Sequence, residues 1–217
     1  MRRRHYLTTG LGLATVAITG TTTAQADEAD LELHDHELIV EEDDITDEVY
    51  VEAILENVGD SPSGQVDLEV DWYDDEGNYL EDNREWLYTF PPGETWEARI
   101  YALGGAAEIA DYELETDSDE TVDVLDPDGL SAVDSEMQVG DRAVEIAGEI
   151  ENETGEEAGY IQAIATIYDE DVVLADDRTN VTDVPAGETW AFEISWRGRD
   201  RVDRADDYEI RITDAPI

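Results

Sequence analysis

The sequence contains no lysine and no cysteine. Because cysteine is absent, disulfide bonds, thiolate metal sites and cysteine nucleophiles are excluded, and stability has to come from packing. The 12 basic residues are all arginine and stand against 59 acidic ones, which gives a formal net charge of -47. We therefore expect no nucleic-acid partner, because neutralising phosphates requires patches of lysine and arginine.

Such an excess of acid would indicate disorder if apolar residues were also scarce. They are not scarce, since 41% of the chain is hydrophobic and it includes five tryptophans and ten tyrosines. The chain can therefore bury cores, and its carboxylates have to lie on the surface. Molar salt shortens the Debye length to about 3 Å and screens their repulsion. This composition is typical of a protein from a halophilic archaeon; a surface for cations or for a basic partner is the alternative interpretation.

Residues 1–26 have the features of a signal peptide. A modest apolar run over 7–18 follows three arginines, and Ala24-Gln25-Ala26 forms an A-x-A cleavage pattern. The stretch RRHYLT resembles a twin-arginine signal, with Arg3 and Arg4 as the pair; an ordinary secretory signal is the alternative. The apolar run is short and rich in threonine and glycine, so we expect no membrane span after cleavage. The predicted location is secreted or at the cell surface.

A six-residue phrase occurs twice, as PPGETW at 91–96 and as PAGETW at 185–190. Other residues match in the same order around the two copies, which is strong evidence for a duplicated domain. The matching pairs are Asn57 with Asn152, Gly64 with Gly159, Tyr73-Asp74 with Tyr168-Asp169, Leu80 with Leu174, and Asp111-Tyr112 with Asp207-Tyr208.

Both copies consist of runs in which apolar and acidic residues alternate, for example over 49–55 and 144–150. One apolar face and one polar face are typical of antiparallel sheets that pack face to face. We therefore predict an all-β protein of two tandem immunoglobulin-like antiparallel β-sandwich domains. Their predicted bounds are 31–117 and 136–214, joined by an acidic linker over 118–135 in which Thr121–Leu125 could form an extra strand.

The repeated phrase has the chemistry of a corner between a turn and a strand. Gly93 and Gly187 are predicted to take the positive φ that closes the turn. Trp96 and Trp190 are predicted to be buried equivalents, one in each core; a binding role for them is the alternative. Tyr112 and Tyr208 are the corresponding anchors of the last strand in each copy.

The order of these motifs resembles the FxLYD domain in two copies. The shared features are Asn before a Gly turn, a strand that ends in Tyr-Asp, then Pro-x-Gly-Glu and a closing Tyr-x-Ile or Tyr-x-Leu strand. The resemblance covers most of 37–117 and 130–214, and the second copy is closer through GEIEN (148–152) and Phe192. The stretch ENVGDSPSG also resembles the CARDB domain. Both resemblances imply an extracytoplasmic interaction or surface-structural role and supply no catalytic residues.

No catalytic residue and no cofactor site can be proposed from the sequence. His34 and His36 would share one face of a strand, so they are weak candidates for two metal ligands. Asn152 and Asn180 begin glycosylation sequons on expected loops.

Two classes of function remain open. The first is a non-catalytic surface module that binds an unknown protein or cell-envelope component. The second is a ligand- or cation-binding accessory protein, or an enzyme with an unrecognised site.

The charge predicts that folding depends on salt. Domains of this size are stable by only about 5–15 kcal/mol, and unscreened carboxylate repulsion opposes that stability. We expect the protein to fold cooperatively in molar KCl or NaCl and to lose this cooperative folding as the salt concentration falls towards tens of millimolar. Low pH should replace salt in part. Thermal melts across a salt series measure this. A melting temperature independent of salt would instead support a cation-binding purpose for the acid.

Overall fold

A computed structural model of the chain describes residues 3–6, 30–42, 47–104, 108–119 and 125–216. Its regular structure is nearly all β, apart from a short 3-10 helix, η2 (Arg199–Arg204). The strands are β1 (Arg3–Tyr6), β2 (Leu31–Glu42), β3 (Glu48–Asn57), β4 (Val66–Tyr73), β5 (Tyr79–Leu87), β6 (Thr95–Tyr101), β7 (Asp111–Ser118), β8 (Leu130–Val139), β9 (Val144–Asn152), β10 (Ala158–Asp169), β11 (Val172–Val184), β12 (Thr189–Trp196) and β13 (Asp207–Thr213).

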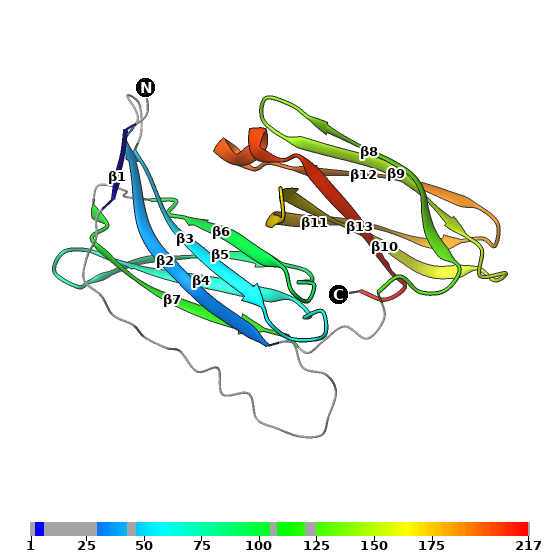
Figure 1. Cartoon of the computed structure of the whole chain (residues 1–217), viewed down its shortest axis with the longest axis horizontal. Helices are drawn as coiled ribbons and strands as arrows, with labels where there is room; N and C mark the ends of the chain where they lie inside the picture. Colours follow the sequence, from blue (N-terminus) through cyan, green and yellow to red (C-terminus); the bar gives the residue numbers. More distant parts are fainter. Residues whose placement is uncertain (1–2, 7–29, 43–46, 105–107, 120–124, 217) are drawn as a thin grey trace, which may run out of the picture.

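The strands form one long sheet and two short ones. The long sheet has seven strands in the order β1-β2-β3-β6-β11-β10-β13, and the short sheets have the orders β5-β4-β7 and β12-β9-β8. Each short sheet packs its apolar face on one half of the long sheet, which creates two hydrophobic cores. Figure 1 shows the two halves as separate colour groups, one from blue to green and one from yellow-green to red. The predicted all-β sandwich architecture is confirmed.

The two halves have the same connectivity. In the first half, β2-β3-β6 lie side by side and face β5-β4-β7. In the second half, β8-β9-β12 face β11-β10-β13 in the same succession. The duplication seen in the sequence therefore corresponds to a duplicated arrangement of six strands.

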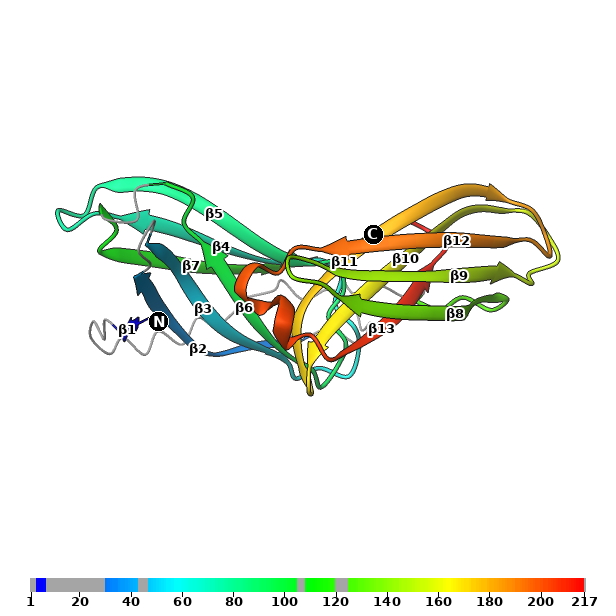
Figure 2. The same cartoon turned by 90° about the horizontal axis from the view of Figure 1, so that it is seen from above.

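The two halves are joined by strand pairing as well as by the chain. The start of β11 runs parallel to the start of β6, with Val172 beside Thr95 and Val173 beside Trp96. Val173 belongs to the core of the first half although it comes from the second repeat. Figure 2 shows the halves meeting at the middle of an elongated molecule.

The segment expected to be a linker is partly strand. Strand β7 continues to Ser118, and β8 already begins at Leu130, so 130–135 belong to the second sandwich. Most side chains of β8 are exposed because it is an edge strand, so its residues are as polar as those of a loop. This polar composition is why the sequence predicted a linker here. Most of Thr121–Leu125 lies outside the described residues. The expected cleavage site in the leader also lies outside the described residues. The described part of the leader is β1, a strand that pairs with β2.

Two equivalent asparagines hold the loop before each repeated phrase. Asn57 and Asn152 end β3 and β9, and both side chains are 0% exposed. The Asn57 amide nitrogen donates to the carbonyl of Phe90 at 2.7 Å, and that of Asn152 donates to the carbonyl of Val184 at 2.9 Å. Both acceptors directly precede the proline of the phrase, so each asparagine ties the end of one strand to the approach of another.

The glycines of the phrase behave as predicted. Gly93 has a φ of 77° and Gly187 a φ of 74°, in the region that glycine adopts without steric cost. Each glycine N–H donates at 2.7 Å to the backbone carbonyl of the asparagine in its own repeat. The corner is therefore built from side-chain and main-chain bonds together.

The tryptophans of the phrase are not equivalent in burial. Trp96 is 0% exposed, as predicted, but Trp190 is only partly buried, so the prediction of two buried equivalents is wrong for the second repeat. Trp96 lies on β6, which has β11 beside it, whereas β12 is the outer strand of its sheet in the described part of the chain. The difference comes from packing between the repeats, which alternation within a strand does not reveal.

The closing tyrosines are partly buried in both repeats. Tyr112 packs against the first core and its hydroxyl lies 2.7 Å from His36 Nδ1 on β2. Tyr208 packs against the second core and its hydroxyl donates to Ser135 Oγ on β8 at 2.9 Å. Each tyrosine therefore links the last strand of its repeat to the first.

We expect both corner asparagines to be structural. Asn57→Ala removes three side-chain hydrogen bonds and Asn152→Ala removes four, and each variant should lower the free energy of unfolding by about 1–3 kcal/mol. The exposed Asn180 on β11 is the control, and Asn180→Ala should change it by less than about 0.5 kcal/mol. Denaturant unfolding in molar salt measures all three. Equal stability of Asn152→Ala and Asn180→Ala would contradict this role.

Candidate functional site

Arginines of the second repeat hold the junction from one side. Arg204 Nε lies 2.7 Å from Asp169 Oδ2, and its Nη2 lies 2.9 Å from Glu97 Oε2 of the first repeat. Arg201 Nη1 donates to the backbone carbonyls of Glu97 at 2.8 Å and of Leu174 at 3.2 Å. The guanidinium groups therefore bridge β6 and the second repeat next to the strand pairing.

The other side of the junction depends on a buried carboxylate. Asp176 Oδ2 on β11 accepts hydrogen bonds from the backbone N–H groups of Tyr88 at 2.7 Å and Thr89 at 3.2 Å. The Arg178 guanidinium lies 4.0 Å above the centre of the Tyr88 ring. Together with the arginine bridge, these contacts make the junction a packed interface.

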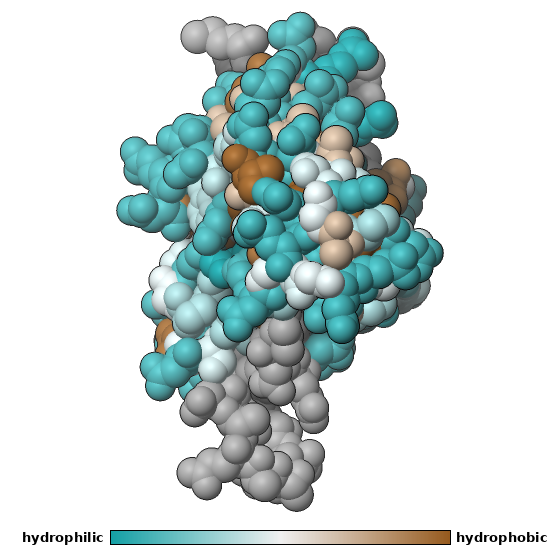
Figure 3. All heavy atoms as spheres, turned by 90° about the vertical axis from the view of Figure 1, so that its right-hand side faces the viewer, coloured by the Kyte–Doolittle hydropathy of each residue, from teal (hydrophilic) through white to brown (hydrophobic). Residues whose placement is uncertain are grey.

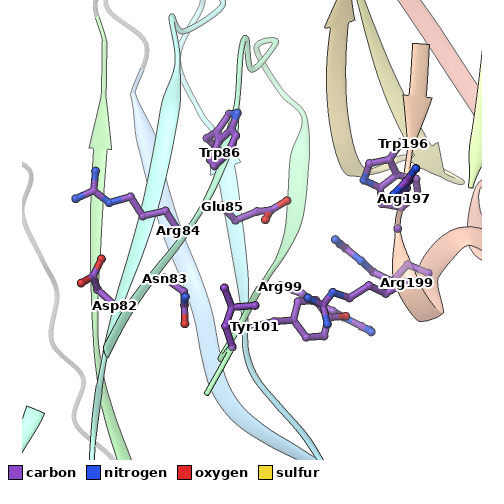
Figure 4. Close-up of a pocket in the computed structure, with 13 residues that line it drawn as sticks. Asp82, Asn83, Arg84, Glu85, Trp86, Arg99, Tyr101, Trp196, Arg197 and Arg199 are labelled. Atoms are coloured by element: carbon purple, nitrogen blue, oxygen red, sulfur yellow. The ribbon is translucent and has the colours of Figure 1, made fainter. Parts of the chain in front are cut away.

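A cleft of about 350 Å³ opens beside this junction. One wall comes from β5 and β6, and the other from the end of β12 and η2, so both repeats are needed to form it (Figure 4). Its lining combines guanidinium groups and aromatic rings with a few acids. The lining residues are Asp82, Asn83, Arg84, Glu85, Trp86, Arg99, Tyr101, Leu103, Trp196, Arg197, Gly198, Arg199 and Arg201.

The cleft concentrates the few positive charges of the molecule. Five of the 12 arginines line it, in a chain whose formal net charge is -47. The surface around the second repeat is mainly hydrophilic, as Figure 3 shows from that end. A cleft rich in one sign of charge within a field of the other focuses the potential at that place.

Arg99 and Arg84 are already neutralised. Arg99 is almost fully buried and contacts the carboxylates of Glu52, Glu97 and Asp200 at 2.8, 3.2 and 3.0 Å. Arg84 pairs with Glu69 and points away from the second repeat in Figure 4. These two arginines therefore shape the cleft and offer little charge to a ligand.

Arg201 is buried with little compensation. Its side chain is 3% exposed, and no carboxylate of the described residues lies within 4.0 Å of it. Its Nε has no hydrogen-bond partner among the described atoms, and its guanidinium lies 5.5 Å from the centre of the Trp196 ring. Burial lowers the pKa of Arg201. An anion in the cleft would relieve the cost of this buried charge.

Glu85 faces the same space from β5. Burial raises the pKa of Glu85, while the charges of Arg201 and Arg199 act in the opposite direction. In Figure 4 its carboxylate points towards the second repeat, next to the exposed ring of Trp86. Glu85 therefore offsets part of the charge of the cleft from a distance greater than an ion pair.

The mouth of the cleft presents exposed cations and aromatic rings. Arg197 is exposed and makes no ion pair with the described residues. The Arg199 guanidinium lies 4.2 Å above the centre of the Tyr101 ring, and its Nη1 makes a long ion pair with Glu48 Oε1 at 3.8 Å. The φ of Arg199, 54°, turns the chain sharply after β12. Trp86 is 44% exposed on the opposite wall. Guanidinium groups bind carboxylates with two parallel bonds, and the rings supply flat apolar faces.

The predicted metal candidates are not brought together. A bulge between Leu33 and Asp35 changes the alternation of β2 at His34. His34 Nε2 contacts Glu56 at 2.5 Å, whereas His36 contacts Tyr112 at the edge of the core. The prediction of a shared face is therefore wrong, and no metal-binding group of three or more His, Asp or Glu side chains occurs in the described part of the chain.

The two sequons have different environments. Asn152 is fully buried and its amide nitrogen donates two hydrogen bonds, so it is not accessible in the folded protein. Asn180 is exposed but lies on β11 and not on the expected loop. Asn180 stays a candidate for modification.

Comparison with known proteins does not add a name to this site. No family model and no curated protein matches the chain. Within the described residues, no helix is both long and apolar enough to cross a membrane. The cleft was not found by sequence reasoning, although three arginines within RGRDR (197–201) are a conspicuous signal in so acidic a chain.

We expect Asp176 to make the junction sensitive to pH. Burial raises the pKa of Asp176 to about 8, although the N–H groups of Thr89 and Tyr88 oppose this. The unfolded chain releases the proton near pH 4 and the folded protein keeps it to about pH 8, so this residue lowers stability progressively as pH rises between those values.

Asp176→Asn cannot titrate and should therefore gain stability relative to the wild type across this window, by at most about 1.4 kcal/mol per pH unit. Denaturant unfolding at constant molar salt and several pH values measures the difference. The exposed Asp203 gives the control variant Asp203→Asn. A constant difference between Asp176→Asn and the wild type would show that Asp176 is already ionised in the folded protein.

Proposed function

We propose that the chain is a non-catalytic module of two immunoglobulin-like β-sandwich repeats, secreted or held at the cell surface, that mediates interactions in high salt. We infer that the cleft between the repeats binds a carboxylate-bearing group of a protein or envelope component. The observation that carries this is the gathering of five of 12 arginines around one cleft of a chain with a net charge of -47.

The size and the charge of the cleft favour a small anionic group over a long polyanion. A cavity of about 350 Å³ holds one or two sugar rings or a peptide end. A nucleic acid would extend over the acidic surface and be repelled by it. A uronic acid or an acidic peptide presents one carboxylate to the guanidinium groups and flat or apolar surface to Trp86 and Trp196.

High salt makes a buried arginine more useful than an exposed one. Charges separated by more than about 3 Å of molar salt solution hardly interact, so attraction from the surface is lost. A guanidinium group inside a cleft is screened less and acts at contact distance. Arg201 is 3% exposed and Arg197 stands at the mouth, so a ligand would meet both kinds.

The location rests on the sequence. The leader over 1–26 resembles a twin-arginine signal, and the motif order resembles the extracytoplasmic FxLYD domain. The second candidate function is a small-ligand accessory protein, which the volume of the cleft, about 350 Å³, favours. A free sugar acid would bind as well as a polymer in that case.

Titration calorimetry of the full chain in molar NaCl tests the proposal. The probes are oligogalacturonate, monomeric galacturonate, hexaglutamate and, as the neutral control, a glucose oligosaccharide. Arg197→Ala/Arg199→Ala should weaken carboxylate binding by about tenfold or more, because charge-assisted bonds are lost. Arg142→Ala removes an exposed arginine that lies in the turn before β9, near the end of β12, but does not line the cleft, and it should leave binding unchanged.

The outcomes separate the alternatives. Binding of oligogalacturonate or hexaglutamate but not of the monomer supports an interaction module, and equal binding of the monomer supports the accessory role. No binding by any carboxylate, or equal loss in Arg142→Ala, would contradict the proposed site.

A further inference from the structure

The junction between the repeats consists of a hairpin tip on one side and a strand flank on the other. The tip lies between β10 and β11 and carries Val172 and Val173; the flank is the start of β6, with Thr95 and Trp96. Val173 is fully buried in the core of the first repeat. Because the chain is duplicated, each repeat contains its own copy of both parts.

In the junction the second repeat supplies the tip, so the corresponding tip of the first repeat is not docked on a repeat of its own chain. We call it the unused tip. Leu80 matches Leu174, so Tyr79 occupies the place of Val173 and Asn78 that of Val172. Tyr79 is 53% exposed, and Asn78 is exposed beside it. The tip that would insert into a neighbouring repeat therefore carries a large exposed aromatic side chain.

The corresponding flank of the second repeat, at the start of β12, is likewise not paired with a tip, and we call it the unused flank. Thr189 and Trp190 match Thr95 and Trp96 in the repeated phrase. Thr189 is exposed and Trp190 is only partly buried, and β12 has no strand on its outer edge among the described residues. An outer strand with free backbone groups is ready to pair with another chain.

A polar contact of the junction also has both of its counterparts. The Tyr168 hydroxyl donates to Glu94 at 3.0 Å across the junction. The matching residues are Tyr73 and Glu188, which lie next to the unused tip and flank. Glu188 is exposed, and the Tyr73 hydroxyl, which donates to Glu113 at 3.1 Å within the chain, would exchange that carboxylate for Glu188 of the next copy.

The unused tip and flank lie at opposite ends of the molecule. Figure 2 shows the turn between β4 and β5 at one end of the long axis and the turn between β11 and β12 at the other. A tip cannot reach the flank of its own chain in this arrangement. Contacts of this head-to-tail type join two different surfaces, so they extend as an open row unless the rotation between copies closes a ring.

We propose that copies of this chain assemble head to tail, with the β4–β5 tip of one copy docked beside β12 of the next. The docking repeats the parallel pairing of β11 with β6, so that Tyr79 covers Trp190 as Val173 covers Trp96. In the assembled row the first and second repeats of successive copies alternate, and a tip occupies each flank except the one at the end of the row.

The contact between copies is weaker than the junction within the chain. Glu97, which binds Arg204, is matched by Ala191, and the sequence over 102–110 contains no arginine that would correspond to the η2 arginines. The junction within the chain also benefits from the high effective concentration of linked repeats. Assembly therefore requires concentrated protein and enough salt to screen the carboxylates.

Engineered cysteines test the pairing directly, because the chain has no cysteine of its own. Asn78→Cys/Thr189→Cys places thiols at the counterparts of Val172 and Thr95, which are strand partners and so lie within disulfide reach. Mild oxidation in molar salt should give a ladder of oligomers on a non-reducing gel. Val139→Cys/Thr189→Cys keeps one thiol and moves the other to an exposed place on β8, and should give no ladder.

Mixing the single variants Asn78→Cys and Thr189→Cys should give mainly the mixed dimer, because the contact joins two different surfaces. Sedimentation equilibrium of the wild type should show a mass that rises with concentration, and Tyr79→Ser should weaken this association at least about tenfold. Val139→Ser is the control. A monomeric wild type at the highest soluble concentration together with no ladder would overturn the proposal, and so would ladders of equal yield from both double variants.

Discussion

The parallel pairing of β11 with β6 is the contact on which the rest of the molecule depends. It places Val173 in the core of the other repeat and brings the η2 arginines over β6, where Arg204 meets Glu97 at 2.9 Å. Without it the cleft would have one wall, since β5 and β6 supply one side and the end of β12 and η2 the other. The pairing is short, so the surrounding charged contacts are needed to keep it in register. The orientation of the repeats and the cleft are thus consequences of the same contact.

The scarcity of positive charge explains where the arginines lie. A chain with 59 acidic residues and 12 arginines has too few cationic side chains to neutralise its own surface. Arg99 and Arg201 are buried in the cleft, where their charges are screened less than at the surface. Arg99 is balanced by three carboxylates, whereas Arg201 is held by backbone carbonyls and an aromatic ring.

Duplication also leaves unequal copies. Asn57 and Asn152 make the same bonds, and Gly93 and Gly187 have nearly the same φ, because these groups serve the interior of each repeat. Trp96 and Trp190 differ in burial because only the first lies at the junction. Matching residues inside the two repeats therefore have the same contacts, whereas matching residues at the edges of the repeats differ in burial. The exposed copies of junction residues, Tyr79 and Thr189, are the basis of the proposed contact between copies.

The sequence by itself determined many of the strands, the duplication and the corner glycines, because alternation and turn chemistry act over a few neighbouring residues. It missed the start of β8 and the end of β11, which were expected to be linker and loop. It also indicated the salt-adapted surface, which is a property of composition. Only the tertiary structure decided that His34 and His36 separate at a bulge, that Asn152 is buried, and that arginines far apart in the sequence surround one cleft. Those outcomes depend on register and on the docking of the repeats. A parallel contact between β6 and β11 leaves no periodic trace in either strand, so it can be seen only when the two strands are placed side by side.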